Sequence, residues 1–264
     1  MTARLSVVVL VAFVCAGCFR STTLVTIKPD GSGTIEQEMG MKPETVAMLK
    51  SMAGASGGKD TKDLSADLFS EKQARENADK LGVTFVSGEP LKTAEMEGYR
   101  AHYTFDDISK LQMKMGQQAA QMAEASGDKA DTAKSPIVFE LAKGGSSSTL
   151  TIRLPEQTPA GSLSQLPVDS SQDAAQNAQA LAMVKTMMAG LFVDFTLAFD
   201  GKVLKSSQPL NGNRLTLLQM DFDKMLQDPT ALQKLKGSKN LAGLQGVPGL
   251  TVPSTNTLTI EFAK

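Results

Sequence analysis

The polar and apolar positions of this chain mark out short alternating strands separated by turn residues. Residues 22–27 and 34–39 alternate β-branched or apolar with polar side chains on either side of Asp30-Gly31. Glycine supplies the positive φ of a tight hairpin turn, so the two runs are predicted to pair as antiparallel strands. Similar patterns predict strands over residues 83–87, 99–105, 137–141, 149–154, 192–199, 202–207, 214–219 and 257–262.

Helical spacing of apolar residues occurs between these strands. The spacing predicts a short helix from Pro43 to Ala53 and a last helix that begins at Asp221 or Asp223 and runs to about Leu235. Longer helices are predicted over residues 65–81, 107–124 and 172–190, with loose loops over 54–63 and 126–135. Because hairpins force neighbouring strands to run in opposite directions, we expect an α+β fold: a mainly antiparallel sheet with helices packed on one face.

The order of hairpin, helix, further strands and helix occurs twice, in residues 22–126 and 136–236. Locally, YTFDDISKL at 103–111 resembles LQMDFDKML at 218–226, since each strand runs into an Asp-capped helix. Two interpretations stay open. The chain is a duplicated ββαββα unit, or it has the ordinary layout of an α+β domain.

The first twenty residues, MTARLSVVVLVAFVCAGCFR, differ from the rest of the chain. A single cation, Arg4, precedes the apolar run 5–14, which is too short to span a bilayer and has the length of a signal-peptide core. Small Ala16 and Gly17 then lead to Cys18, whose thiol can act as a nucleophile. This arrangement resembles the lipobox of bacterial lipoproteins, with lipidation at Cys18 and cleavage between Gly17 and Cys18.

The lipobox resemblance implies a signal peptide at 1–17, an acylated tether at 18–21 and an extracytoplasmic domain at 22–264. Cys15 stands where lipoboxes usually have Leu or Val, and it is the only other cysteine, so the mature domain would hold no free thiol. Phe19, in place of the Asp of an inner-membrane retention signal, favours the outer membrane, facing the periplasm, in a Gram-negative cell. The alternatives are an ordinary secretory signal that contains Gly-Cys and an uncleaved anchor.

Charge and motifs argue against several classes of function. The 27 cations and 28 anions balance to a net charge of −1, which gives nucleic-acid binding no electrostatic support. His102 is the sole histidine and is predicted on a strand face, and Asp106 and Asp107 are predicted helix caps. Residues 30–33 lack the spaced acidic ligands of a calcium loop, and we expect no metal or cofactor. We therefore expect a protein that is not an enzyme; a hydrolase using Asp106 or Asp107 is the remote alternative.

Methionine is unusually frequent, at 14 residues. Met115 and Met122 fall on one predicted helix, and Met187 and Met188 on another. Flexible thioether side chains suit a groove that accepts a lipid or a partner protein, and they equally serve as ordinary core filler.

From Cys18 through TTLVTIKPDGSGTIEQEM, the chain resembles bacterial lipoproteins of the LppM-like group, which begin with a strand, a Gly-rich Asp-Gly turn and a return strand. The resemblance implies an envelope-anchored α+β domain with a role in lipid binding, and it supplies no catalytic residue. Together with the signal, it predicts a lipid-anchored envelope protein, held in the membrane through Cys18, that binds a lipid, a glycolipid or an envelope protein. A structural or assembly lipoprotein without a small ligand is the alternative.

Overall fold

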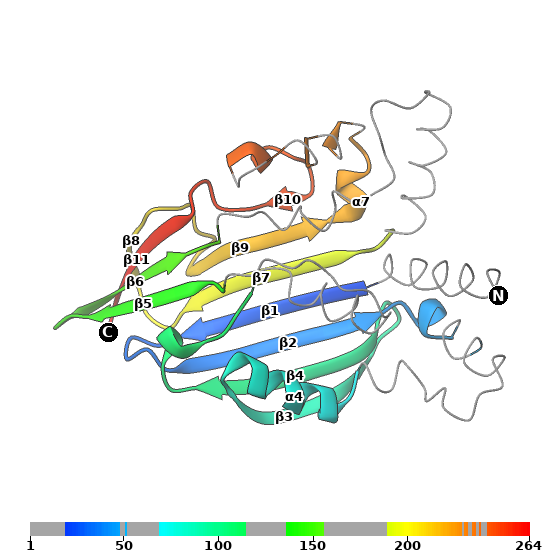
Figure 1. Ribbon diagram of the computed structural model, residues 1–264, viewed down its shortest axis with the longest axis horizontal. Helices are drawn as coiled ribbons and strands as arrows, with labels where there is room; N and C mark the ends of the chain where they lie inside the picture. The colour runs from blue at the N-terminus through cyan, green and yellow to red at the C-terminus, as the bar shows by residue number, and fades with distance from the viewer. Residues whose placement is uncertain are drawn as a thin grey trace, which may run out of the picture.

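The computed structural model describes two β-sheets and a few short helices (Figure 1). The described residues are 19–47, 51, 69–114, 136–155, 189–228, 230–231, 234–235, 238 and 242–264. In chain order the elements are β1 (Phe19–Ile27), β2 (Gly33–Met41), α4 (Glu71–Leu81), β3 (Thr84–Lys92), β4 (Glu97–Phe105), η2 (Ile108–Lys110), β5 (Val138–Lys143), β6 (Ser147–Arg153), β7 (Phe192–Phe199), β8 (Val203–Ser206), β9 (Arg214–Asp221), α7 (Phe222–Met225), η4 (Ala242–Leu244), β10 (Leu250–Thr251) and β11 (Thr257–Ala263).

The larger sheet has seven strands in the order β10-β9-β7-β1-β2-β4-β3, which places β1 at its centre. Among the described strands, every pairing in both sheets is antiparallel except that of β1 with β7. The predicted α+β class with mainly antiparallel strands is therefore confirmed. The central strand joins the first and second halves of the sequence, because Arg20 lies beside Phe192.

The β1–β2 hairpin turns at Asp30-Gly31, as the sequence predicts. Gly31 has φ of +88°, and its N–H donates to Lys28 O at 2.9 Å. The Asp30 carboxylate accepts hydrogen bonds from the N–H and the hydroxyl of Ser32, at 2.9 and 2.7 Å. These bonds hold the pKa of Asp30 below its usual value. The aspartate therefore serves the turn, which agrees with the prediction of a hairpin in place of a calcium loop.

The smaller sheet has the order β5-β6-β11-β8 and lies toward the end of the large sheet where β1 finishes (Figure 1). The two sheets share one large apolar core, in which the rings of Phe199 and Phe262 lie 5.1 Å apart. Strands of residues 136–236 are divided between the two sheets, whereas those of residues 22–126 all lie in the large one. The duplication of a ββαββα unit stays a prediction.

Helix α4 is the described part of the helix predicted over 65–81. Its N-cap Ser70 accepts a hydrogen bond from Gln73 N at 3.2 Å, and Gly82, at φ 72°, ends it. Ala74 and Ala78 are buried against β3 and β4. The other long helices predicted to cover the sheet lie wholly or mainly outside the described residues, so helix packing on one face stays a prediction.

The helix predicted over 107–124 is wrong in its described part. Asp107 does cap a helical turn, but this 3₁₀ turn η2 ends at Lys110, and the next residue, Leu111, is extended with a ψ of 132°. The N–H of Gln112 then donates to Leu81 O at 3.0 Å, and Met113 O accepts from Ile137 N at 2.7 Å. Hydrogen bonds to distant parts of the chain replace the helical bonds here, so local spacing misled the prediction.

The last predicted helix begins at Asp221 but is interrupted. Helix α7 ends at Met225, and Asp228 caps a new segment by accepting the N–H of Thr230 at 2.8 Å. The sequence has a proline at position 229, a residue type that cannot donate a helical hydrogen bond and so disfavours a continuous helix here. Among the described residues, no helix has the length and hydropathy needed to cross a membrane.

Candidate functional site

The structure does not describe the residues that the sequence singled out for lipidation and ligand binding. Gly17 and Cys18 lie outside the described residues, as do the groove candidates Met115, Met122, Met187 and Met188. What the structure does describe is the start of the folded domain. Strand β1 begins at Phe19, so residues 19–21, expected to be a tether, are already part of the sheet.

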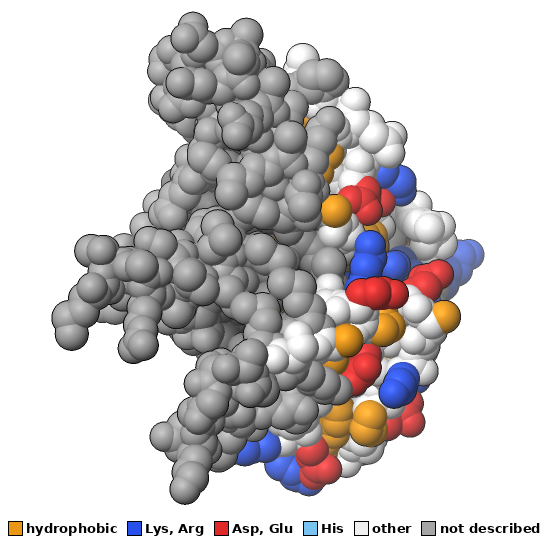
Figure 2. Space-filling model, turned by 90° about the vertical axis from the view of Figure 1, so that its right-hand side faces the viewer, with side chains coloured by type: hydrophobic (Ala, Val, Ile, Leu, Met, Phe, Trp, Pro, Cys, Tyr) orange, Lys and Arg blue, Asp and Glu red, His pale blue; other side chains and the backbone are white. Residues whose placement is uncertain are grey.

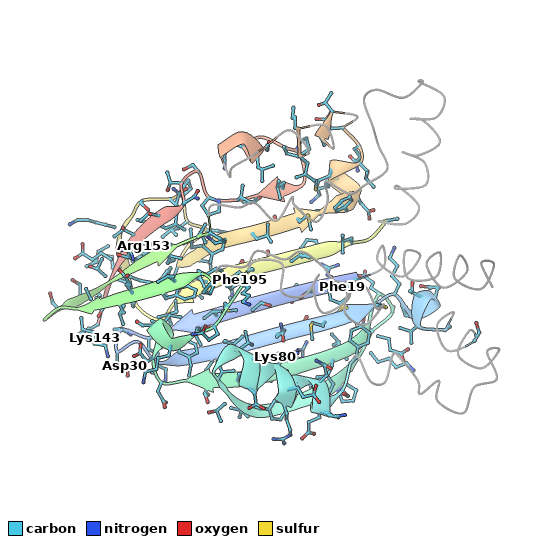
Figure 3. The ribbon with its side chains drawn as sticks, viewed as in Figure 1. Phe19, Asp30, Lys80, Lys143, Arg153 and Phe195 are labelled. Carbon is cyan, nitrogen blue, oxygen red and sulfur yellow. The ribbon has the colours of Figure 1, made fainter. Side chains whose placement is uncertain are left out.

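Phe19 is buried at one end of the large sheet, with only 4% of its surface exposed. It packs with Met39, Met41 and Val46 in a small apolar cluster that is separate from the main core. Figure 3 places Phe19 at the end of the sheet opposite Asp30 and Lys143. We call this the anchor end, because residue 18 directly precedes it.

Buried polar side chains follow Phe19 and Met39 along the inner face of β1 and β2. Ser21, Thr23 and Gln37 are at most 6% exposed. The hydroxyl of Ser21 has no hydrogen-bond partner among the described residues. The hydroxyl of Tyr103 lies 3.5 Å from Oε1 of Gln37, and burial raises the pKa of Tyr103, with a further contribution from nearby Tyr99. A polar belt therefore accompanies the anchor-end cluster in an otherwise apolar face.

The surface of the anchor end is hollowed. The hollow has a volume of about 710 Å³ and is lined by the start of β1 and β7, the end of β2 and β9, the β3–β4 turn and α7. Small residues Ala94 and Gly190 leave room in it, and Met41 and Leu191 contribute apolar walls. A hollow of this size can admit a polar headgroup or a short segment of a partner chain.

Several charged side chains around the hollow are held by contacts within the protein. Lys224 Nζ lies 3.1 Å from Asp221 Oδ2, and the Asp223 carboxylate accepts the N–H of Gly190 at 2.8 Å. The guanidinium of Arg20 lies 4.5 Å from the centre of the Phe192 ring, which fixes its position by a cation–π contact. These contacts shape the wall formed by β1, β7 and α7.

The remaining charges face the hollow from the other wall. Lys42, Glu44 and Glu95 are exposed, and among the described residues they form no ion pair. Figure 2 shows the anchor end with Lys or Arg and Asp or Glu side chains close together and hydrophobic side chains between them. Charges of both signs around a partly apolar hollow suit a ligand that is zwitterionic or uncharged and polar, because neither sign dominates the field.

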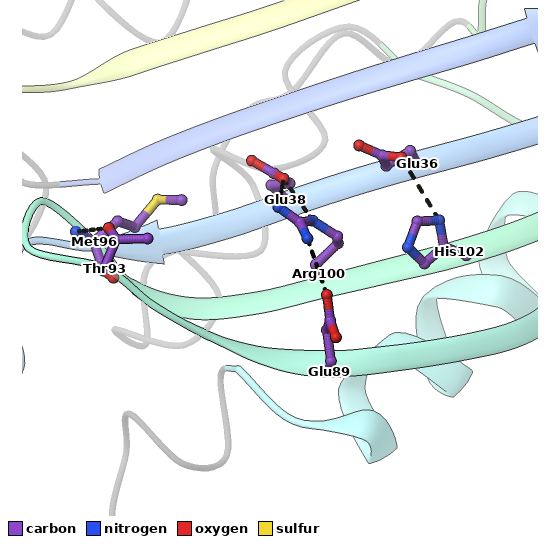
Figure 4. A network of polar contacts seen from close by, with 7 residues as sticks. All are labelled: Glu36, Glu38, Glu89, Thr93, Met96, Arg100 and His102. Atoms are coloured by element: carbon purple, nitrogen blue, oxygen red, sulfur yellow. Dashed lines mark hydrogen bonds and ion pairs between the residues drawn. The ribbon is translucent and has the colours of Figure 1, made fainter.

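The outward face of the large sheet, away from the core, carries a separate network (Figure 4). Arg100 on β4 donates to Glu38 at 2.6 Å and to Glu89 at 2.9 Å, and these contacts, chiefly the hydrogen bond to Glu38, raise the pKa of Arg100. His102 Nδ1 lies 3.7 Å from Glu36 Oε2, with both side chains about half exposed. Glu36 and Glu38 face His102 and Arg100 in the register of β2 and β4, and Glu89 faces Arg100 in the register of β3 and β4, as in ordinary sheet stabilisation.

The predicted roles of the remaining candidates agree with their positions. His102 lies on β4 and points to the polar face, whereas its neighbour Tyr103 points into the core. Asp107 caps η2 by accepting the N–H of Ser109 at 3.0 Å, and adjacent Asp106 lies between β4 and that turn. In the described part of the chain, no group of three or more His, Cys, Asp or Glu side chains is placed to hold a metal ion.

Reasoning from the sequence did not single out the charged residues of the hollow. A signal for some of them existed, since the Asp30-Gly31 turn sets the register in which Phe19 pairs with Met41. That register already places Lys42 directly after the residue that faces Phe19. The contributions of Phe192 and Lys224 come from strand pairings between distant parts of the chain and have no local signal.

Comparisons with known proteins give few matches. No protein-family model matches the chain, and no curated protein does. Among solved structures, the chain is similar to the folded domain of LppM from Mycobacterium tuberculosis, determined by NMR. The two are 13% identical over 94% of this chain and 91% of that domain, with a TM-score of 0.32.

Proposed function

We propose that the chain is a membrane-anchored bacterial envelope lipoprotein, not an enzyme, whose hollow at the anchor end binds the headgroup of a lipid or glycolipid. The observation that carries this proposal is the start of β1 at Phe19, directly after the proposed acylated residue Cys18. The lipobox-like sequence supports acylation, and the geometry of the sheet supports the position of the binding site.

The distance between anchor and hollow is short. Consecutive Cα atoms are about 3.8 Å apart, so Arg20 lies within about 8 Å of Cys18 along the backbone. Two or three acyl chains on Cys18 hold it stably at the bilayer surface. With Phe19 buried in the sheet, the rim of the hollow at Arg20 and Lys42 is brought to the level of the lipid headgroups.

The surroundings of the titratable candidates support a role without catalysis. A hydrolase needs a nucleophile with an oriented base. His102 contacts a carboxylate of the neighbouring strand on the half-exposed polar face, and Asp107 is used as a cap. Neither side chain lines the hollow.

The test has two parts, and the first concerns the anchor. The full chain is expressed in a bacterial host and labelled with a palmitate analogue, beside a Cys18→Ser variant. We expect label on the wild-type protein and none on the variant. A Cys18→Ser protein that still carries the label contradicts acylation at this residue.

The second part concerns the ligand. Native mass spectrometry of the acylated protein, extracted gently from the envelope, is expected to show a co-purifying lipid. Lys42→Ala should reduce its occupancy, whereas Lys143→Ala, at the opposite end of the molecule, should not. An empty domain contradicts lipid binding. If that empty domain reproducibly retains one envelope protein, the assembly role replaces the proposed one.

A further inference from the structure

The hollow at the anchor end carries charged groups of both signs. Its charged lining side chains are three cations and four carboxylates: Arg20, Lys42, Lys224, Glu44, Glu95, Asp221 and Asp223. Among the described lining residues, negative groups therefore outnumber positive ones by one. The field of the hollow thus gives a headgroup with a net negative charge no advantage over a zwitterionic one.

Contacts within the protein use three of these seven groups. Lys224 Nζ lies 3.1 Å from Asp221 Oδ2, and the Asp223 carboxylate accepts the N–H of Gly190 at 2.8 Å. The other four are exposed and, within the ranges that the structure describes, form no ion pair: Arg20, Lys42, Glu44 and Glu95. Two positive and two negative groups are thus left to a ligand.

The strand register brings opposite charges to neighbouring segments of the hollow. Met41 pairs with Glu97 where β2 ends and β4 begins. Lys42 directly follows Met41, and Glu95 lies two residues before Glu97 in the β3–β4 turn. A ligand at this end of the sheet can therefore meet a cation on one segment and a carboxylate on the next.

The aromatic content of the hollow distinguishes between the amines that a zwitterionic headgroup can carry. A quaternary ammonium such as choline is bound by the faces of aromatic rings. Among the described residues that line the hollow, Phe192 is the sole aromatic one, and the guanidinium of Arg20 lies 4.5 Å from its ring centre. A primary ammonium has three N–H donors, for which Glu44 and Glu95 supply carboxylate acceptors. The lining therefore suits a primary amine better than choline.

We propose that the hollow selects a zwitterionic phospholipid with a primary ammonium, the chemistry of phosphatidylethanolamine. Its phosphate binds Arg20 and Lys42, and its ammonium binds Glu44 and Glu95. This inference rests on the proposed binding of a lipid in the hollow and narrows it to one headgroup class. A guanidinium stacked on a ring keeps N–H donors at its edge, where a phosphate can accept them. An uncharged sugar headgroup would cover the same four groups without offering any of them an opposite charge.

The test measures lipid occupancy by native mass spectrometry on the protein purified in detergent from a bacterial envelope and freed of bound lipid. Four probes share the same short acyl chains and differ in headgroup: phosphatidylethanolamine, phosphatidylcholine, phosphatidylglycerol and a glucosyl diacylglycerol. Phosphatidylethanolamine should bind with a dissociation constant at least about tenfold lower than the other three, because each hydrogen bond to a charged group contributes about tenfold or more in affinity.

Glu95→Gln tests the ammonium contact and spares the fold. The turn that carries Glu95 is held by its backbone, since the N–H groups of Glu95 and Met96 donate to Thr93 Oγ1 at 3.2 and 2.9 Å. The variant should bind phosphatidylethanolamine more weakly and phosphatidylglycerol no more weakly, so that the margin between them falls below about threefold. As the matched control, Glu36→Gln removes a carboxylate that is 47% exposed on the outward face and does not line the hollow, and it should keep the full margin.

Equal affinity for the four probes, or tighter binding of any other headgroup, would overturn the selection of phosphatidylethanolamine and leave lipid binding intact. The same loss of margin in Glu95→Gln and Glu36→Gln would overturn the ammonium contact. Glycerophosphoethanolamine, which has the same headgroup and no acyl chains, should bind more weakly than the lipid because it lacks the methylenes that can cover Leu191. Equal binding of this soluble compound, or binding of none of the four lipids, contradicts the proposed function itself, so the two kinds of failure are distinguishable.

Discussion

Replacing Phe19 by Ala tests whether the folded domain truly begins at residue 19. Phe19 lies at the first position of β1 and is 4% exposed. It packs with Met39, Met41 and Val46. If residues 18–21 were a loose tether, this substitution would have almost no effect on the free energy of unfolding.

The structure sets the size of the expected effect. Burial of an aromatic side chain removes about 150–250 Å² from water, which at about 25 cal/mol per Å² corresponds to roughly 4–6 kcal/mol as an upper bound. Phe→Ala substitutions in cores cost about 3–5 kcal/mol. Because the anchor-end cluster is small and lies at the end of a strand, where neighbours can relax into the space, we expect a loss of about 3 kcal/mol.

Urea unfolding of the chain from residue 19 onward, followed by circular dichroism, measures this loss. Phe19→Leu keeps most of the apolar volume and should cost less than about 1.5 kcal/mol. Val86→Ala changes an apolar side chain that is 57% exposed and should stay within about 0.5 kcal/mol of the wild type. A loss below about 1 kcal/mol for Phe19→Ala would refute the packing of residue 19 and, with it, the argument for a short anchor.

Three further predictions follow from described contacts. Gly98→Ala should prevent stable folding, because the added Cβ would lie 2.0 Å from Met39 O. Gly145→Ala, whose Cβ would meet nothing within 4 Å, should leave the melting temperature nearly unchanged in the same thermal unfolding experiment. Hydrogen bonds from Ser147 and then Lys205 lower the pKa of Glu261 below 4.5 in the folded protein. The ionised carboxylate therefore stabilises the fold fully above pH 4.5, and this contribution is lost as the pH falls through the lowered pKa of the folded state. Glu261→Gln should flatten the decline of the unfolding free energy at acid pH. Burial raises the pKa values of Tyr99 and Tyr103 above 10, so the free energy of unfolding should fall as the pH rises above 10. Because the chain has no other tyrosine and no tryptophan, tyrosinate absorbance reports on these two rings alone and should appear only with unfolding. Titration of both rings before unfolding would contradict their burial.

The sequence predicted the strands well because their signals are local. The Asp30-Gly31 turn fixes the β1–β2 hairpin through glycine's positive φ, and alternation of burial along β1 follows the alternation of its residues. The helices were predicted less well. Between Leu111 and Met113, hydrogen bonds to Leu81 and Ile137 hold an extended segment that apolar spacing alone had marked as helix.

The candidate site could be predicted only in part. Hairpin register alone places Lys42 at the anchor end, because Phe19 is opposite Met41. The pairing of β1 with β7 brings Phe192 to Arg20, and no pattern within either strand specifies that choice of partner. The methionine groove at residues 115, 122, 187 and 188 lies outside the described residues and stays a prediction.

The most direct test of the central claim, that the anchor end faces the lipid headgroups, is fluorescence quenching in vesicles. Once Cys15 has left with the signal and Cys18 carries lipid, a single new cysteine can be labelled without side reactions. A fluorophore on Glu44→Cys at the hollow is compared with one on Gly145→Cys at the far end of the molecule, since the nine-residue β1 alone spans about 30 Å. With nitroxide-labelled headgroups in the bilayer, the account predicts strong quenching at residue 44 and little at residue 145. Equal quenching at the two positions, or stronger quenching at residue 145, would contradict it.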